Sequence, residues 1–519
     1  MERKNYIIAI DLGSSNVTVA VGEKNAEGLL DVVCVVRKPV EGVNAGKIEN
    51  IELVGNAIRE AVAEVEKRTG ISVAEAYAGI SGDFVRCARH TDHVFVNDPQ
   101  NGVSQKDVAG LFDRMRNVQA PDDETIMERV PQNYVVDDAQ EVLNPVGSFG
   151  RKLSSTFNFI LCHNTPIQRL EMALKRLGIR ILRVLPDALV IPEAVLSSDE
   201  KEEGVAVVDV GGGVTDVTVY YRNVVRYVAS IPMGATAFNR DIRTMSIPEK
   251  HVEQLKLQCG SAVAELVPDD TCVRVPGRIA REEKVVLHRN LATVIEARAT
   301  DIAEFVVQEI KDSGYFGKLA FGIVLTGGSA SLKNLDELFR RVTGLEVRVA
   351  LPETGLSERA RERVKDPAFA TVVGMLLRGA ELGASSVLVD LPAPAPAAAH
   401  ATGRPAEAPG ADAAAGRPEP RPEASVRSTG FRPPQPPPVP EFRHVPPRQQ
   451  PAPPVAEPEP ERAEAPQPQF RPEPDVDAEP APENGGRRRR EWGAIFKNAI
   501  NKLNSSFTTM EEDDPDQEI

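Results

Sequence analysis

Cysteine is scarce in this sequence, and its five cysteines are scattered, with no Cys-x-x-Cys pair. Such a pattern is typical of reduced thiols in a cytosolic protein. No apolar run approaches the roughly 18 residues that a membrane-spanning helix needs. Charged residues at positions 2 to 4 precede only a short strand-like run, so no N-terminal signal peptide is predicted. The formal net charge of −15 argues against nucleic-acid binding.

Proline is unevenly distributed, because most of the 42 prolines lie beyond residue 391. The 519 residues leave room for more than one domain. The part before the proline-rich region is long enough to bury a large core. The sequence therefore predicts a folded body followed by a long segment of different character.

One glycine-rich stretch stands out within the folded part. Residues 205–220 read VAVVDVGGGVTDVTVY, a run of β-branched residues that ends in Asp209, three glycines and a second β-rich run. This pattern predicts a buried strand, a tight turn and a partner strand. Glycines let the backbone approach a ligand and direct N–H groups at anionic oxygens. An acid at the strand end can hold a hydrated Mg²⁺ beside phosphates. An ordinary hairpin with a glycine-rich turn is the alternative.

A second stretch repeats this pattern 198 residues earlier. Residues 7–21 read IIAIDLGSSNVTVAV, in which Asp11 aligns with Asp209 and Gly13 with Gly211. Two equivalent hairpins predict two halves of one molecule that face each other. A third stretch, residues 322–335, reads GIVLTGGSASLKNL. It predicts a strand, a turn at Gly327 and Gly328, and the start of a helix.

The three motifs Asp-x-Gly-Ser-Ser, Asp-x-Gly-Gly-Gly-x-Thr-Asp and Thr-Gly-Gly-Ser, in this order and spacing, resemble those of the actin/Hsp70/sugar-kinase ATPase superfamily. Within it, the chain is similar to the FtsA family of bacterial cell-division proteins. The residues that narrow the resemblance are Ile80-Ser81-Gly82, the run VPQNYVVD at 130–137 and Asn144-Pro145-Val146-Gly147. FtsA proteins carry an inserted segment there. The resemblance covers about residues 5 to 390.

This resemblance implies an α/β fold, the actin-like (RNase H-like) two-domain ATPase fold, with an inserted subdomain. We expect the first actin-like subdomain at 1–83 and 366–390, and the inserted subdomain at 84–163. The second actin-like subdomain is expected at 164–234 and 317–365. A smaller subdomain is expected at 235–316, and in FtsA it receives the C-terminal peptide of the tubulin-like GTPase FtsZ. A disordered linker at 391–486, an amphipathic helix at 487–507 and an acidic tail at 508–519 complete the expected organisation.

The resemblance also implies a cleft for ATP and Mg²⁺ between the two halves. The expected nucleotide-binding residues are Asp11, Gly13, Ser14, Ser15, Asn16, Gly211, Gly212, Gly213, Thr215, Glu253, Lys256, Gly327, Gly328 and Ser329. Asp11, Asp209 and Asp216 are expected to hold the metal through water.

Two of the assignments compete with simpler explanations. Glu253 and Lys256 are three residues apart and therefore share a helix face, where a solvent-exposed ion pair is the alternative to contact with adenosine.

Relatives that hydrolyse ATP often carry Glu or Gln just before a Pro-x-Ala sequence, but here Leu185 precedes Pro186. Asp187 is therefore only a weak catalytic candidate, and slow or no ATP hydrolysis is expected.

The segment 391–486 is rich in Pro, Ala, Glu and Arg and poor in aliphatic residues. Such a composition cannot bury enough apolar surface to offset chain entropy, so a disordered linker is predicted. As a flexible coil, its roughly 95 residues span about 55 Å on average. Overlapping Pro-x-x-Pro runs at 431–440 are candidate ligands for another domain, although a spacer is the simpler interpretation.

The composition then changes abruptly at residue 487. Six basic residues and one acid give the segment 487–507 a charge of +5, and its apolar residues fall on one face of a helix. This pattern predicts a helix that lies in an anionic membrane surface, although a helix that docks in a protein groove has the same pattern. The expected membrane-binding residues are Arg487, Arg488, Arg489, Arg490, Trp492, Ile495, Phe496, Lys497, Ile500, Lys502, Leu503 and Phe507. In FtsA such a helix usually closes the chain, whereas here six acids and no base follow from Glu511 onward.

Together these features lead to one functional hypothesis. The chain is expected to bind ATP, to assemble with copies of itself on the cytoplasmic face of the cell membrane, and to anchor FtsZ polymers at the division septum. Later division proteins are further expected partners, and nucleic acid is not. A sugar-kinase-like phosphotransferase is one alternative. The other alternative is a different actin-like scaffold that acts in rod-shape control or pilus assembly.

Overall fold

The computed structural model describes residues 6–138, 140–276, 283–384 and 444–445, all within the compact unit Met1–Gln449. The predicted linker at 391–486, apart from residues 444–445, the predicted membrane helix at 487–507 and the acidic tail at 508–519 lie outside the described residues. The architecture below is therefore that of the folded body.

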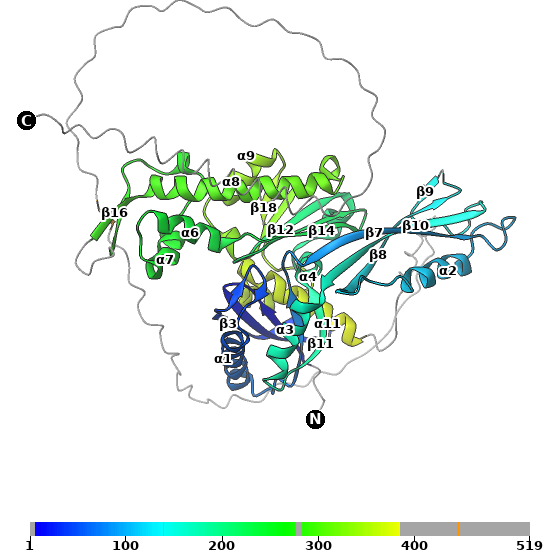
Figure 1. The fold of residues 1–519 in the computed structure, drawn as a ribbon, viewed down its shortest axis with the longest axis horizontal. Helices are drawn as coiled ribbons and strands as arrows, with labels where there is room; N and C mark the ends of the chain where they lie inside the picture. The colour runs from blue at the N-terminus through cyan, green and yellow to red at the C-terminus, as the bar shows by residue number, and fades with distance from the viewer. Residues whose placement is uncertain (1–5, 139, 277–282, 385–443, 446–519) are drawn as a thin grey trace, which may run out of the picture. The chain divides into compact units, whose positions relative to one another are not determined.

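The first half of the body is built on a mixed five-stranded sheet (Figure 1). Its strands, in sheet order, are β11 (Arg180–Pro186), β6 (Glu75–Ile80), β1 (Ile7–Leu12), β2 (Asn16–Lys24) and β3 (Leu30–Pro39). β1 and β2 form an antiparallel hairpin, and β6 runs parallel to β1. A short second hairpin, β4 (Val43–Asn44) with β5 (Lys47–Ile48), joins this sheet to helix α1 (Ile51–Thr69).

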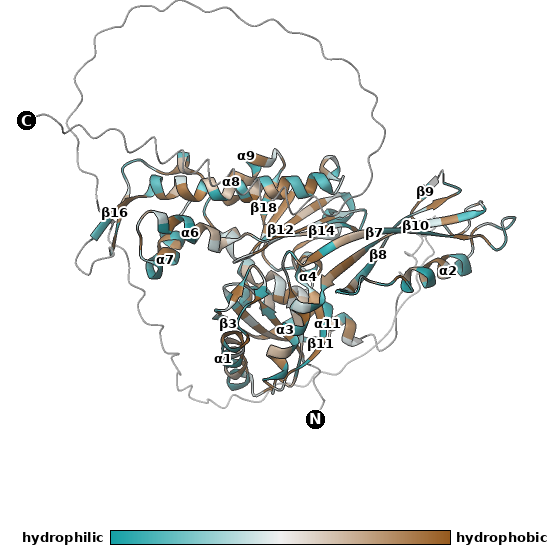
Figure 2. Ribbon diagram, in the orientation of Figure 1, coloured by the Kyte–Doolittle hydropathy of each residue, from teal (hydrophilic) through white to brown (hydrophobic). Residues whose placement is uncertain are grey.

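Alternating side chains of this sheet enter two different cores. Ile8 and Ile10 pack with residues of α1 and α3 (Asn164–Lys175). Ala9 packs on the other face with α4 (Asp187–Val195) and α11 (Ala370–Ala384). Because successive strand residues point to opposite faces, a strand that is apolar at nearly every position is buried on both sides. The strands are accordingly apolar in Figure 2.

The second half repeats this arrangement. Its sheet consists, in order, of β14 (Val224–Ile231), β13 (Thr215–Tyr221), β12 (Val205–Val210), β17 (Ile323–Thr326) and β18 (Val347–Val349). β12 and β13 form an antiparallel hairpin, and β17 runs parallel to β12. Asp209 pairs with Asp216 across this hairpin, just as Asp11 pairs with Thr18 across the first. The internal repeat predicted from the sequence is therefore present as two equivalent hairpins.

A four-stranded sheet is inserted after β6. It contains, in order, β7 (Val85–Phe95), β10 (Lys152–His163), β8 (Glu124–Val136) and β9 (Gln140–Val142), and it packs on α2 (Gln105–Arg116). Ser104 caps α2 through a reciprocal hydrogen-bonded box with Asp107, as its sequence indicates. The insert has a core of its own, which includes Leu111, Phe157 and Leu161.

The remaining elements lie mostly after the second hairpin. They are α5 (Ser198–Glu203), α6 (Ala235–Thr244), α7 (Glu249–Cys259), η1 (Ala264–Leu266), β15 (Cys272–Pro276), β16 (Glu283–Leu287), α8 (His288–Asp312), η2 (Phe316–Lys318), η3 (Gly328–Ser331), α9 (Leu335–Thr343), α10 (Glu358–Arg363), η4 (Pro367–Phe369) and β19 (His444–Val445). β15 pairs with β16 and β19, and α6 packs on both α7 and α8.

One boundary expected from the sequence is wrong. Residues 164–186 were expected in the second half, but β11 pairs in parallel with β6 of the first sheet from Arg180↔Glu75 to Pro186↔Ile80. Helix α3 packs against α1 and β11 of that same half. The chain therefore returns from the insert to the first sheet and crosses to the second half only after β11. Local patterns predict the strand correctly but not its partner, because that pairing spans about a hundred residues.

No helix in the described ranges combines the length and the apolar character that a bilayer crossing requires.

Candidate functional site

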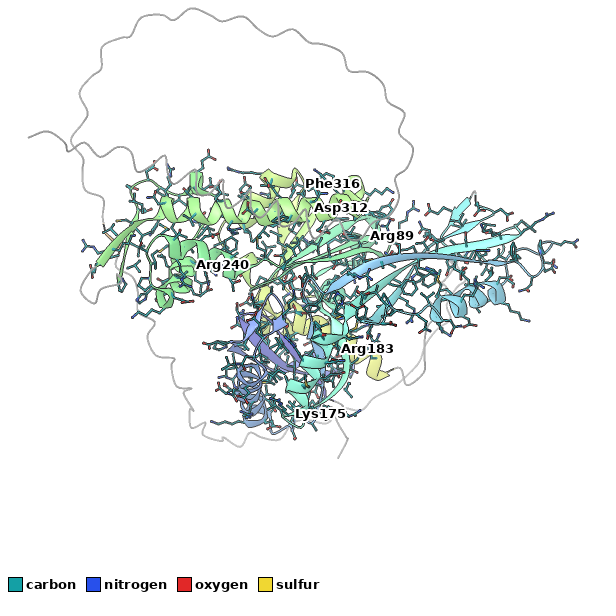
Figure 3. All side chains as sticks on the ribbon, in the orientation of Figure 1. Arg89, Lys175, Arg183, Arg240, Asp312 and Phe316 are labelled. Carbon is teal, nitrogen blue, oxygen red and sulfur yellow. The ribbon has the colours of Figure 1, made fainter. Side chains whose placement is uncertain are left out.

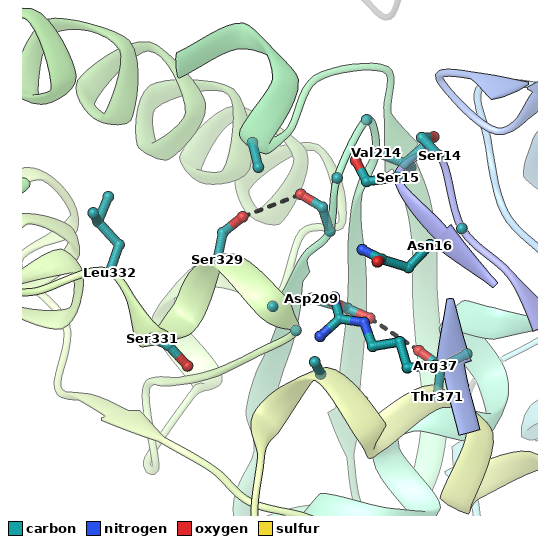
Figure 4. A pocket seen from close by; sticks show the side chains of 18 of the residues that line it. Ser14, Ser15, Asn16, Arg37, Asp209, Val214, Ser329, Ser331, Leu332 and Thr371 are labelled. Carbon is teal, nitrogen blue, oxygen red and sulfur yellow. Dashed lines mark hydrogen bonds between the residues drawn. The ribbon is translucent and has the colours of Figure 1, made fainter. Parts of the chain in front are cut away.

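A cavity of about 920 Å³ is lined by both halves of the body. It falls within the size range of small-molecule and cofactor sites. The two hairpin turns, residues 12–16 and 211–214, lie beside each other in its lining (Figure 4). Thirteen of the predicted nucleotide-binding residues line it: Asp11, Gly13, Ser14, Ser15, Asn16, Gly211, Gly212, Gly213, Glu253, Lys256, Gly327, Gly328 and Ser329.

The two turns have the same internal geometry. Gly13 N donates to Asn16 O at 3.0 Å, and Gly211 N donates to Val214 O at 2.9 Å. The turns also approach each other closely: a Cβ on Gly212 would lie 2.4 Å from Ser15 Oγ. A side chain at this position would press on Ser15 of the other turn, so the close contact favours glycine here.

Thr215 is the one predicted residue that the structure places elsewhere. Its side chain is fully buried, and its Oγ1 donates to Met233 O at 2.8 Å. Thr215 opens strand β13, where successive side chains point to opposite faces. Asp216 therefore faces the cavity, while Thr215 faces the core behind it.

Five aspartates line the cavity, and burial raises the pKa of four of them. The five are Asp11, Asp187, Asp209, Asp216 and Asp366, and the last is not among the four. Burial raises the pKa of Asp209 to about 8, with Asp216 and Asp11 adding to the effect. Burial likewise raises the pKa of Asp11 to about 7, against the opposing effect of Arg37, and that of Asp216 to about 6. The pKa of Asp187 lies well above its ordinary value, first through burial and then through the other three carboxylates.

The hydrogen bonds around these carboxylates are incomplete. Asp216 accepts from Ser81 Oγ at 2.6 Å and from the hydroxyl of Ser230. Asp209 accepts only a long bond, 3.3 Å, from Thr371 Oγ1 (Figure 4). The Oδ1 atoms of Asp209 and Asp187 are buried and have no hydrogen-bond partner. Buried polar atoms of native proteins are nearly always paired, so these two atoms mark a place where a ligand, ion or water belongs.

Glycine also lets the backbone approach Asp209. Gly327 has a φ of +86°, and a Cβ there would lie 1.8 Å from Asp209 Oδ1. Next to it, Ser329 Oγ donates to Gly211 O at 3.2 Å (Figure 4). The Thr-Gly-Gly-Ser motif is therefore in direct contact with the second hairpin, close to its acid.

The arrangement of acids suits a hydrated cation better than a directly ligated one. In the described ranges, no three His, Cys, Asp or Glu side chains lie close enough together to ligate one metal ion. The acids nevertheless share one cavity and include two partnerless oxygens. Mg²⁺ keeps several of its waters when protein carboxylates and phosphates bind it. The residues present therefore fit a metal held through water.

Glu253 and Lys256, both on α7, also line the cavity. Lys256 Nζ donates to Glu253 Oε2 at 2.8 Å, and Asn239 Nδ2 donates to the same oxygen at 2.6 Å. The Lys256 side chain is 7 % exposed and that of Glu253 is 54 % exposed. The pair is therefore more than a surface ion pair, because the lysine is buried against the cavity.

Several lining residues lie outside the motifs. Arg37, Gly46, Ser81 and Thr371 come from four separate segments of the chain. Ser81 belongs to a sequence that supports the family resemblance, but nothing in that sequence indicates that its hydroxyl reaches Asp216. No local signal identifies the other three.

Comparisons with known proteins identify the family. The family model described as "Cell division protein FtsA" matches residues 206–374, and that described as "SHS2 domain inserted in FTSA" matches residues 82–161. The cell division protein FtsA of Pseudomonas aeruginosa is 30% identical over 376 residues, which cover 72% of this chain and 89% of that protein. The chain belongs to the FtsA family.

Other family members are similar at nearly the same level. The FtsA protein of Escherichia coli is 29% identical, with 73% of this chain and 91% of that protein covered. That of Bacillus subtilis is 28% identical, with 72% and 84% covered. A solved structure of a PilM–PilN type IV pilus biogenesis complex matches with a TM-score of 0.49 at 14% identity, covering 72% of this chain and 98% of that one.

Family membership and the duplicated sheets agree on the architecture. The chain is an actin-like cell-division protein with a two-domain α/β body and an inserted SHS2 domain.

Proposed function

We propose that the cavity binds ATP together with hydrated Mg²⁺. The observation that carries this proposal is the pair of equivalent glycine-containing turns that meet in the lining of one cavity, beside buried and incompletely paired carboxylates. Backbone N–H groups of such turns bind phosphate oxygens. Ser14, Ser15 and Asn16 would contact the phosphates from one side, and Gly211, Gly212 and Gly213 from the other.

Asp11, Asp209 and Asp216 would hold the water shell of the metal. Mg²⁺ supplies positive charge that neutralises the phosphates when it is bound. The same charge would favour the ionised form of the three carboxylates, whose pKa values burial raises. Glu253, Lys256, Gly327, Gly328 and Ser329 would line the nucleoside.

We infer that ATP hydrolysis is slow. Asp187, the one catalytic candidate, begins helix α4 and is buried, with its pKa well above the ordinary value. Burial and the neighbouring carboxylates disfavour the ionised form of Asp187, which is the form that accepts the proton of an attacking water. Asp187→Asn should accordingly change the rate of phosphate release only a few-fold.

Gly212→Ala tests nucleotide binding directly. The added methyl group would meet Ser15 and displace the two turns from each other. We expect the affinity for a fluorescent ATP analogue, measured with Mg²⁺, to fall at least about tenfold. Gly110→Ala is the matched control, because a Cβ there meets nothing within 4 Å. Equal affinity in the wild type and both variants would contradict the assignment of the cavity.

We also propose the cellular role that the family and the C-terminal sequence support. The chain would assemble into filaments on the cytoplasmic face of the membrane at the division septum. It would bind the FtsZ tail through residues 235–316, and later division proteins are further proposed partners. One amphipathic helix binds a membrane modestly, so an assembly that carries many of them would gain affinity through multivalency.

Two truncations test the membrane anchor. A chain that ends at residue 486 lacks the basic amphipathic segment, whereas a chain that ends at residue 510 lacks only the acidic end. With vesicles that contain anionic lipid, we expect the first to lose flotation and the second to keep or increase it. Flotation of the chain ending at 486 equal to that of the full chain would exclude this anchor.

A pull-down with the C-terminal peptide of FtsZ tests the partner. We expect binding by the full chain. Unchanged binding after removal of residues 391–519 would show that the folded body holds the peptide, and absence of binding by the full chain would contradict the proposal.

A further inference from the structure

One small sheet carries a piece of the C-terminal region on its edge. β15 pairs along its whole length with β16 on one side, and it pairs with β19 on the other. β19 consists of His444 and Val445, the only described residues beyond α11. The sheet lies at the start of α8, at the opposite end of that helix from Asp312 (Figure 3). The chain therefore contacts the body again well beyond Ala384, where α11 ends.

β15 is fixed in place by the rest of the body. Val273 and Val275 share one face of the strand and are fully buried. Arg274, on the opposite face, is exposed and forms an ion pair with Glu283 of β16 at 3.3 Å. Helix α7 contacts β15, and α8 contacts β16. The outer edge of β15 therefore presents its backbone N–H and C=O groups from a rigid support, as a strand-addition site requires.

The pairing between β15 and β19 is antiparallel and short. Val445 lies opposite Cys272, and His444 lies opposite Val273. In an antiparallel ladder, opposed pairs alternate between those that exchange two hydrogen bonds and those that exchange none. Two neighbouring pairs therefore supply one such exchange. A contact of this size is weak, so we expect it to form and open reversibly.

The sequence around β19 limits how far the pairing can extend. Pro440 precedes the segment 441–445, and Pro446 and Pro447 follow it. Proline has no N–H group to donate and is excluded from the interior of paired strands. The segment between the prolines reads EFRHV and contains phenylalanine and valine, which are common in strands. The prolines therefore give the pairing segment a defined start and a defined end.

We propose that the edge of β15 is a docking site for the chain's own His444–Val445, and that this reversible contact sets where the spacer to the C-terminal basic segment begins. With the contact formed, the spacer is 446–486; with the contact open, it is 391–486. For the flexible coil that the composition predicts, the average span falls from about 55 Å to about 35 Å when the contact forms. The docking itself does not depend on the proposed function, whereas its effect on membrane reach rests on the proposed anchor.

Limited proteolysis of the full chain with a glutamate-specific protease tests the docking. A protease holds the residues on both sides of the bond in extended form, so it cannot cut after Glu441 while His444 is paired. The bond after Glu423, in the same linker, is the internal reference. The rate of cutting follows the population of the open form. Relative to the same two bonds in a synthetic peptide of residues 420–460, cleavage after Glu441 should be at least about threefold slower.

A double substitution in β19 removes the contact and leaves every residue of β15 and β16 unchanged. His444→Pro with Val445→Pro eliminates both N–H groups, so we expect the cleavage ratio to match that of a synthetic peptide with the same substitutions. Val455→Pro with Ala456→Pro, in the same linker, is the matched control and should keep the slow cleavage after Glu441. A wild-type ratio equal to that of its peptide, or slow cleavage that survives the double substitution in β19, would overturn the docking site.

Fluorescence energy transfer measures the length of the spacer without a membrane. One dye is placed at Asp270, an exposed position just before β15, and the other at Gly485, near the end of the linker. We expect a mean separation of about 35 Å in the wild type and in the control, and a larger one after the double substitution in β19. Equal transfer in all three proteins would overturn the effect on the spacer. Because neither measurement contains lipid, failure of the membrane anchor in flotation is distinguishable from failure of the docking.

Discussion

Two sites in this molecule bury charge, and they differ in how well that charge is paired. In the cavity, Asp11, Asp187, Asp209 and Asp216 are among the carboxylates of the lining, and two of their oxygens have no partner. At the junction between the insert and the second sheet, the Arg226 side chain is 1 % exposed. Burial lowers the pKa of that guanidinium, but each of its nitrogens has an acceptor.

The acceptors of Arg226 come from both sides of the junction. Its Nε donates to Tyr221 O at 3.0 Å, its Nη1 to Gln132 Oε1 and its Nη2 to Asn133 Oδ1, both at 3.1 Å. Asn158 of the insert donates from its Nδ2 to Arg226 O at 2.9 Å. No carboxylate takes part in these bonds, and neutral groups accept all of them. Glu141 and the Tyr315 ring, 5.8 Å from the guanidinium carbon, add to the stabilisation of the charge.

The contrast separates a structural role from a binding role. A buried charge whose hydrogen bonds are satisfied within the protein stabilises one arrangement of the chain. Buried carboxylates that lack partners raise the free energy of the folded state until a cation arrives. The polar groups at the junction are therefore paired within the protein, whereas the cavity keeps buried carboxyl oxygens without a partner.

Arg226→Met should have the largest effect on stability. It leaves the buried amide oxygens of Gln132 and Asn133 without their donor, and we expect a loss of about 2 to 4 kcal/mol in unfolding free energy. Urea denaturation measures it, with Arg59→Met, an exposed position on α1, as the control. A loss no greater than that of the control would show that the junction does not depend on the arginine.

Asp209→Asn should change stability in the opposite direction. It removes a charge whose burial is poorly compensated, so we expect a gain of about 1 to 3 kcal/mol in the absence of nucleotide at pH 8. Affinity for ATP with Mg²⁺ should fall about tenfold in the same variant. Asp92→Asn is the control of opposite sign, because Arg114 lowers the pKa of Asp92 and its removal should destabilise the protein. A destabilised Asp209→Asn protein would contradict the comparison.

The stability of the nucleotide-free protein should decrease as the pH rises. The carboxyls of Asp11, Asp209 and Asp216 have pKa values of about 7, 8 and 6 in the folded state against 3.8 as the ordinary value. Between about pH 4 and pH 8 the folded state therefore binds more protons than the unfolded state. The free energy of unfolding falls as the pH rises through that window. Thermal unfolding at pH 5.5, 7.0 and 8.5 measures the decrease, which should be shallower in Asp209→Asn. A rise in stability over this range would reverse the predicted sign.

Of the four predicted effects, that of Lys256→Met on nucleotide affinity should be the smallest. Lys256 is buried beside Glu253 and is proposed to line the nucleoside, which ATP and ADP share, so its loss should weaken both equally, by a few-fold. Fluorescence titration with both nucleotides measures this, with the exposed Lys250→Met on the same helix as the control. A selective loss of ATP binding would place Lys256 at the phosphate end instead.

Much of this protein is determined locally and can be read from the sequence. The two hairpins that end in Asp11 and Asp209 follow from β-branched runs interrupted by small residues. Their similarity, 198 residues apart, is enough to predict two facing halves and the position of the cavity between them. The basic amphipathic pattern at 487–507 likewise depends only on residue order, and its membrane role stays a prediction.

The partners of these elements were decided only by the tertiary structure. β11 pairs with β6 and so belongs to the first half, Thr215 turns into the core, and Arg37, Gly46 and Thr371 reach the cavity from distant segments. Arg226 reads as a surface residue in a strand until Gln132 and Asn133 of the insert enclose it. The physical reason is that periodicity and turn chemistry depend only on residues that are close together in the sequence. Burial, pairing and the perturbed pKa values depend on groups that are neighbours only in the folded chain.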